Sequence, residues 1–162
     1  MTDKITTVLW FDMNGREAAE FYVSLLPDSR IDNIIASPSD NPSMKEGGEL
    51  VVDFTLAGRS YSALNGGPNF KPNESVSFMI VTEDQEETDR LWNAIVGNGG
   101  QESACGWCKD KWGFSWQISP RILLDLLTDK DHARSKRGFE AMMTMKKIDI
   151  AAIEAAADGV AA

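Results

Sequence analysis

The sequence predicts an α+β protein made of two copies of a strand, helix, strand, strand, strand (βαβββ) module, followed by a helical extension. The first observation is an internal repeat, since a shift of about 70 residues superimposes two predicted helix starts. The second is a short apolar run before each of those helices, typical of a buried strand. The third is a change to helical periodicity after Pro120. A chain of 162 residues is expected to form one domain, 1–162.

The first module, about residues 4–67, opens with the apolar run 8–11. Asn14 is the predicted N-cap of the next helix, with Glu17 in its first turn and Pro27 at its end. Three strands are predicted after the helix, the last two as a hairpin, at 31–36, 50–56 and 59–64. The loop 38–48 has no counterpart in the second copy, and it is either a mobile flap or a long surface connection.

The second module, about residues 74–119, repeats this order. The apolar run 78–81 is followed by Asp84 as N-cap, and Gly97 ends the predicted helix. Short strands are predicted near 102–105 and 114–119.

The extension, about residues 120–157, is predicted to hold three helices. Ser119 is the candidate cap of the first, with Pro120 at its first helical position. The second covers about 131–145, and the third begins near Asp149. Such short amphipathic helices must bury their apolar faces against the sheet or another subunit.

Composition narrows the class of function. The formal net charge is −9, and the basic residues do not form a footprint for a phosphate backbone, so nucleic acid is not an expected partner. No apolar run approaches the roughly 20 residues that span a bilayer, and no signal peptide is evident, so a soluble cytoplasmic protein is expected. Two cysteines do not make a disulfide framework.

Several segments carry a family resemblance. They are Leu9-Trp10-Phe11-Asp12, Ala63-Leu64-Asn65-Gly66-Gly67-Pro68, Asn73-Glu74-Ser75-Val76-Ser77-Phe78, Cys105-Gly106-Trp107, the turn Asp110-Lys111-Trp112-Gly113, and the tail 142–150. With these segments the chain resembles, over about residues 4–157, the vicinal oxygen chelate (glyoxalase/bleomycin-resistance/dioxygenase) superfamily. Within it the chain is similar to the PhnB-like branch, often labelled 3-demethylubiquinone-9 3-methyltransferase. The resemblance implies an eight-stranded, cup-shaped mixed sheet and a homodimer.

Metal-dependent relatives hold an ion inside that cup, so the resemblance also implies where ligands would stand. These positions fall at Thr7, at Ser75 or Ser77, near Asn65 and at Gln117. Hydroxyls and amides are weak neutral ligands for divalent first-row ions. We therefore expect no metal and no other cofactor, unless groups such as Asp53 or Glu74 hold an ion.

The cup is instead expected to bind an unidentified small molecule through a mostly apolar surface with a few polar groups. The alternative is that the aromatic side chains only fill the interior of the sheet. The candidate ligand-binding residues are Thr7, Trp10, Tyr61, Asn65, Ser75, Ser77, Phe78, Trp116 and Gln117.

Whether the chain is an enzyme stays open at this point. A lyase, a dioxygenase or the methyltransferase of the family label could use the same cup, with Glu74, Asp53 or Tyr61 as acid or base. Cys105 and Cys108 have redox-pair spacing but not the expected helix start, and His132 is expected at the surface. The sequence names neither the ligand nor whether a dimer completes its pocket.

Overall fold

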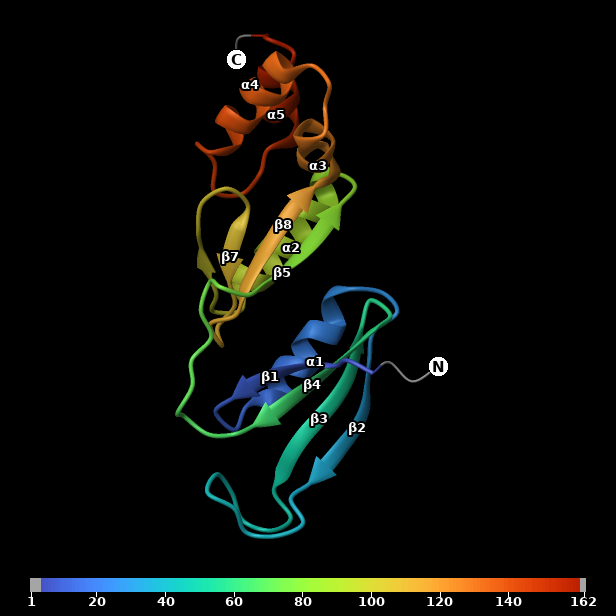
Figure 1. The fold of residues 1–162 in the computed structure, drawn as a ribbon, viewed down its shortest axis with the longest axis vertical. Coiled ribbons are helices and arrows are strands. Elements are labelled where there is room, and N and C mark those ends of the chain that lie inside the picture. Colours follow the sequence, from blue (N-terminus) through green and yellow to red (C-terminus); the bar gives the residue numbers. More distant parts are fainter. Residues whose placement is uncertain (1–3, 161–162) are drawn as a thin grey trace. The chain divides into compact units, whose positions relative to one another are not determined.

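The first half of the chain forms a four-stranded mixed sheet with one helix. The computed structural model describes residues 4–160, and the residues up to Lys71 make one compact unit. The strands run in the order β1-β4-β3-β2, with β1 parallel to β4 and the other pairs antiparallel (Figure 1). The elements are β1 (Thr7–Phe11), α1 (Gly15–Leu25), β2 (Arg30–Ala36), β3 (Glu49–Leu56) and β4 (Arg59–Asn65).

The residues from Pro72 onward make a second unit with the same strand order, β5-β8-β7-β6. Here too the opening strand is parallel to the closing strand, β5 to β8, and the other pairs are antiparallel. The elements are β5 (Ser77–Thr82), α2 (Gln85–Gly97), β6 (Gln101–Glu102), β7 (Trp107–Lys109) and β8 (Ser115–Pro120).

Three further helices belong to the second unit: α3 (Arg121–Leu127), α4 (His132–Met142) and α5 (Ile150–Ala157). Their buried cluster includes Leu126, Ile148 and Ile153. The segment before α5 also pairs with the second module, because the Cys105 and Gly106 amides donate to the carbonyls of Met145 and Lys146. The extension is thus part of the second unit's fold.

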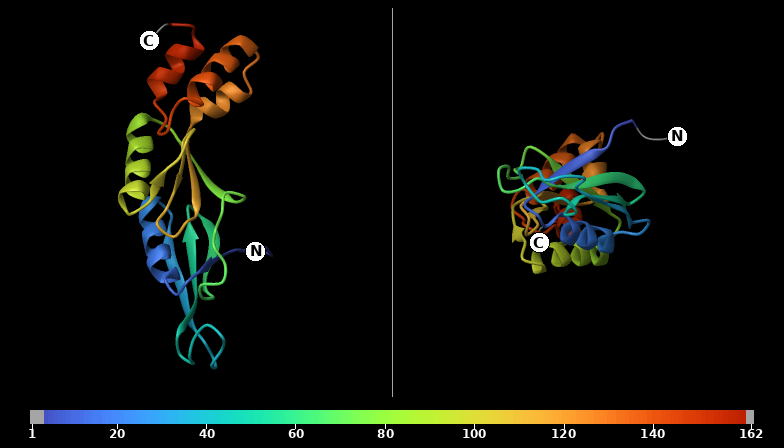
Figure 2. Two further views of the ribbon diagram at one scale, coloured as in Figure 1. Left: turned by 90° about the vertical axis from the view of Figure 1, so that its left-hand side faces the viewer. Right: turned by 90° about the horizontal axis from the view of Figure 1, so that it is seen from below.

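Each helix of a module covers one face of its own sheet and leaves the other face open (Figure 2). Leu9 and Phe11 are buried on the α1 side, whereas Val8, which precedes Leu9 and lies on the opposite face, is 56% exposed. Trp116 and Ile118 are buried on the α2 side, whereas Met79 is 52% exposed. The two-residue strand period therefore defines an open face for each sheet.

The predicted α+β class, with two βαβββ modules and a helical extension, is confirmed. Asp84 accepts from the Glu87 amide as a helix cap, whereas Asn14 stands at the N-cap without a side-chain hydrogen bond. The predicted capping role of Ser119 is wrong, since Ser119 lies inside β8 and Pro120 precedes α3.

One predicted strand is also misplaced. Strand β6 ends at Glu102, and the predicted strand cannot extend to Cys105, because Cys105 and Gly106 adopt left-handed φ angles of 59° and 80° that extended pairing does not allow. The second strand after the helix, β7, begins only at Trp107, and no strand was predicted at its residues.

The loop 38–48 folds back on itself. The Ser37 amide donates to the Gly48 carbonyl and the Gly47 amide donates to the Ser37 carbonyl, which closes its base. Inside it, the Asn41 carboxamide accepts from the amides of Ser43 and Met44. These bonds favour the interpretation as a long surface connection.

Candidate functional site

The open face of the second sheet carries a cluster of polar side chains. In the strand register Ser115 on β8 lies between Ser77 on β5 and Lys109 on β7. Gln117 lies two residues after Ser115 on β8, and so on the same face, and its Nε2 donates to Ser77 Oγ at 2.8 Å. Because register partners share a face, Ser77, Lys109, Ser115 and Gln117 form one polar group, which we call the β8 cluster.

Ser115 is the least satisfied member of the β8 cluster. Its side chain is buried, with 1% exposure, and its Oγ has no hydrogen-bond partner among residues 4–160. A hydroxyl can donate one hydrogen bond and accept two, and an unpaired buried polar group is costly. Such a group in a native fold is explained by an ordered water, a bound group or a functional role.

Lys109 brings a positive charge to the cluster. Its ammonium pairs with the Glu74 carboxylate, and the two side chains are 30% and 64% exposed. The hydrogen bond from Lys109 holds the pKa of Glu74 below its usual value. Glu74 is therefore a carboxylate at neutral pH, which is the wrong protonation state for a general acid.

The turn before β8 is built by Asp110, which is 4% exposed. One carboxylate oxygen accepts from the amides of Trp112 and Phe114, and the other accepts from Trp116 Nε1 at 2.9 Å. This buried carboxylate fixes the chain direction into β8, and so it positions Ser115 and Gln117.

Two predicted site residues, Phe78 and Trp116, lie on the helix-covered face of the second sheet. Their rings are in contact, with centroids 4.8 Å apart, and Trp116 is 1% exposed. Trp116 is part of the core, and the partly buried Phe78 packs against it. Ser75 lies before β5, where both its amide and its hydroxyl donate to the Asn73 side chain.

In the first unit, Asn65 also lies on the helix-covered face. Its Oδ1 accepts from the Gly15 amide at 2.9 Å, and its Nδ2 donates to the Glu49 carbonyl at 2.8 Å. The amide thus ties the start of α1 to the start of β3. Gly15 permits this approach, because a Cβ there would lie 2.9 Å from Asn65 Oδ1.

Trp10 lies on the open face of the first sheet and holds the loop after β4. Its Nε1 donates to the Gly67 carbonyl at 2.8 Å, and its ring meets Phe70 edge-on. Nearby on the same face, Ser62 donates to Asp53 at 2.6 Å. The Asp53 carboxylate therefore already accepts a hydrogen bond from Ser62, its register partner on β4.

Thr7 and Tyr61 are register partners at the edge of the helix-covered face. They line an open hollow together with Ile5, Arg59 and Ser60. Tyr61 also stacks on Phe54 of the core, with centroids 5.5 Å apart. Of the predicted site residues, the structure therefore brings together Thr7 with Tyr61, Ser77 with Gln117, and Phe78 with Trp116 on the helix-covered face.

The positions that correspond to metal ligands do not fit a metal. Asn65 uses both ends of its amide on the backbone, and Gln117 and Ser77 bond to each other. Between residues 4 and 160 there is no group of three or more His, Cys, Asp or Glu side chains that could hold an ion. Neutral donors that already bond protein groups cannot offset the dehydration of a divalent cation.

The cysteine pair also differs from a redox site. Cys105 lies in a turn, and Cys108 lies in β7, 1% exposed. Burial, with the nearby Asp110 charge, raises the pKa of the Cys108 thiol to about 12. The reactive thiolate is thus disfavoured at neutral pH.

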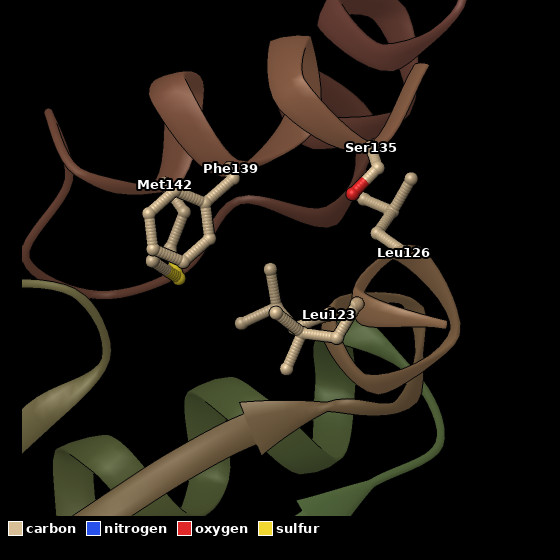
Figure 3. A pocket seen from close by; sticks show the side chains of 6 residues that line it. Leu123, Leu126, Ser135, Phe139 and Met142 are labelled. Atoms are coloured by element: carbon tan, nitrogen blue, oxygen red, sulfur yellow. The ribbon is translucent and has the colours of Figure 1, made fainter. Parts of the chain in front are cut away.

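The extension contains an apolar pocket between α3 and α4 (Figure 3). Ser135 provides its one hydroxyl among the lining residues, and the other side chains are hydrocarbon or thioether. The lining residues are Leu123, Leu126, Leu127, Ser135, Phe139 and Met142.

None of the helices between residues 4 and 160 has the length and apolar character needed to span a bilayer.

Two members of the β8 cluster, Ser115 and Lys109, were not predicted from the sequence. Ser115 could have been found, because Ser115, Gln117 and Ser119 alternate with Trp116 and Ile118 in a polar and apolar pattern of period two. Lys109 could not, because β7 was not predicted.

Comparison with known proteins agrees with the paired modules. The sequence matches the family described as "3-demethylubiquinone-9 3-methyltransferase" over residues 3–119. A putative 3-demethylubiquinone-9 3-methyltransferase, PhnB protein, from Bacillus cereus is 30% identical, with a TM-score of 0.64, over 73% of this chain and 99% of that one. A protein from Pseudomonas aeruginosa shares the fold at 18% identity and TM-score 0.59, over 74% of this chain and 98% of its own. No curated protein gives a significant match.

The paired modules are those of the vicinal oxygen chelate superfamily. Within it, the chain belongs to the PhnB-like family that carries the 3-demethylubiquinone-9 3-methyltransferase label. The family match ends at residue 119, so the expected resemblance over 4–157 is too long. The extension lies outside the matched segment, although it is integrated into the second unit.

Proposed function

We propose that this protein binds a small molecule on the open face of its second sheet, at the β8 cluster, without a resident metal. The observation that carries the proposal is the buried Ser115 hydroxyl, which has no partner within residues 4–160 and lies beside Ser77 and Lys109. Apolar surface for the remainder of a ligand lies next to it, since Met79 and Trp107 are the register partners of Gln117. A few polar groups beside apolar surface are typical of small-molecule sites.

An enzymatic role for the same face is less well supported. The Glu74 carboxylate has the wrong protonation state for a general acid, and as a general base it is already paired with Lys109. Asp53 is bonded by Ser62. The methyltransferase label does not carry over as an activity either. Each sheet has one parallel pair and two antiparallel pairs, unlike the parallel sheet on which a typical methyltransferase binds its cofactor.

We further propose that the chain works as a single functional domain, as a homodimer and in the cytoplasm. The family resemblance supports the homodimer, and the composition supports the location. Sedimentation at micromolar concentration tests the dimer, and a mass of 17.8 kDa, that of one chain, would contradict it.

The binding proposal is tested with a fragment screen read by two-dimensional NMR of the full chain. The side-chain amide of Gln117 is a direct reporter, because its Nε2 bonds Ser77 inside the cluster. We expect a subset of fragments to shift this signal and the backbone amides of β8. An exposed side-chain amide on α2, that of Asn93, is the matched reporter that should stay unchanged. A screen in which no fragment shifts the Gln117 signal would refute the proposal.

A further inference from the structure

The β8 cluster has the chemistry of an oxyanion site. Ser77 Oγ accepts from Gln117 Nε2, so its own hydrogen remains to be donated. Ser115 has a hydroxyl hydrogen without an acceptor among the described residues. Lys109 adds a cationic ammonium on the same face. Three neighbouring donors, one of them charged, match a group that carries several acceptor oxygens and a negative charge.

Within the protein, the Lys109 ammonium already binds one carboxylate, that of Glu74. Glu74 lies just before β5, its side chain is 64% exposed, and it pairs with the Lys109 ammonium. Ion pairs at such exposure are weak, because solvent screens them and two long side chains lose freedom. A ligand carboxylate or phosphate that also bonded Ser115 would therefore compete well against Glu74.

The net negative charge of the chain opposes the binding of an anion, and the Lys109 ammonium counteracts it locally. The chain has a net charge of −9, so a free anion meets an unfavourable average field. A site with its own cation and with donors shielded from water offsets this field, because electrostatic interactions are stronger where water is excluded. Ser115, at 1% exposure, supplies the shielded donor.

We propose that the β8 cluster binds the carboxylate or phosphate group of a small molecule between Ser77, Ser115 and Lys109. When no ligand is bound, the Glu74 carboxylate pairs with the Lys109 ammonium in its place. This inference rests on the proposed small-molecule function and names the chemical class of its ligand. Ligand binding then releases Glu74 to solvent.

The test compares probes of one shape and different charge on the full chain. Benzoate and neutral benzamide are titrated separately, and inorganic phosphate serves as the phosphate probe. We expect benzoate to shift the amides of Lys109 and Ser115 with an affinity about tenfold higher than that of benzamide, since charge-assisted bonds are the stronger ones. Lys109→Met should remove this difference, and Ser115→Ala should reduce it.

Glu74→Gln is the sharper variant, because it removes the internal competitor and should raise benzoate affinity severalfold. Its matched control is Glu102→Gln, which makes the same charge change at the exposed pair of Glu102 with Lys146. Long-range charge alone would strengthen binding equally in both variants. That equality would overturn the displacement of Glu74.

The outcomes separate the two proposals. If benzamide and benzoate bind equally and both shift Gln117, the small-molecule site stands and the oxyanion inference fails. If benzoate, phosphate and benzamide all leave the β8 amides unchanged, the oxyanion inference is refuted, and a negative fragment screen would refute the site itself.

Discussion

Asn65 holds two separate backbone segments through one buried side chain. Replacing it by Leu would leave the Gly15 amide and the Glu49 carbonyl without their partners. Since a buried backbone group without a hydrogen bond costs about 1–3 kcal/mol, we expect Asn65→Leu to lower the free energy of unfolding by about 2–4 kcal/mol. Urea denaturation followed by circular dichroism measures the change.

The control for this variant is Asn93→Leu, which makes the same substitution on the exposed side of α2. Surface changes of this kind stay within about 0.5 kcal/mol. If Asn65→Leu were equally mild, the structural role of the Asn65 amide would be wrong, and the residue would again be a candidate for ligand binding.

Cys108 should be inert toward alkylation in the folded protein. With its pKa raised to about 12 by burial and Asp110, the thiolate fraction at pH 8 is roughly a thousandfold below that of an ordinary cysteine. We expect iodoacetamide to modify Cys105, which is half-buried, well before Cys108. Mass spectrometry of peptides from the labelled native protein gives both rates, and urea-unfolded protein gives the reference. Native labelling of Cys108 at the unfolded rate would contradict this.

Thr7 and Asn65 show why the sequence could not fix the face of every site residue. Strand β1 reads Val8-Leu9-Trp10-Phe11, which is apolar throughout, so no alternation indicates that Thr7 shares the helix-covered face with Leu9. Asn65 bonds Gly15, 50 residues away in the sequence, and no local pattern reports such a contact. Gln117 and Ser77 were predictable because β5 and β8 were placed within a residue of their true bounds.

At the scale of elements, the pairing of β1 with β4 depends on a close approach between Trp10 and the glycines after β4. A Cβ at Gly66 would lie 2.2 Å from Trp10 Cζ2, far inside van der Waals contact. We expect Gly66→Ala to displace the indole, break its bond to the Gly67 carbonyl and cost about 1–3 kcal/mol of stability. The indole N–H signal of Trp10 in NMR spectra reports the displacement, and urea denaturation reports the cost.

Gly97→Ala is the matched control, because a Cβ at Gly97 meets nothing within 4 Å. Alanine there should be neutral, or stabilising by up to about 1 kcal/mol, since it is the better helix former. An unchanged Trp10 signal in Gly66→Ala would show that the loop yields instead of the ring.

At the same scale, the strand and helix order was predictable because caps, breakers and apolar runs are local signals. Asp84, Asp131 and Asp149 each accept from a backbone amide at the start of α2, α4 and α5. The three-residue strand β7 was not, since it is defined by pairing with β8 and follows two residues of positive φ. Short strands of this kind depend on their neighbours more than on their own residues.

At the scale of the whole molecule, the chain combines a segment shared with its family and an extension beyond the family match. The two are joined inside the second unit. Besides the bonds from Cys105 and Gly106, the Gln85 side chain donates to the Ile148 carbonyl and accepts from the Ile150 amide. Ile148, at 1% exposure, belongs to the buried cluster of the extension.

Removal of the extension should therefore loosen the second unit and leave the first unchanged. In a chain ended after Pro120, the Cys105 and Gly106 amides lose their acceptors, and we expect their hydrogen exchange to accelerate by about tenfold or more, as local stability falls. The amides of β3 and β4, which belong to the first unit, provide the control within the same molecule. Hydrogen exchange read by NMR measures both sets at once. Equal protection of Cys105 and Gly106 in the full and shortened chains would mean that the second module holds its turn without the extension. Faster exchange in both units alike would mean that the extension stabilises the chain as a whole.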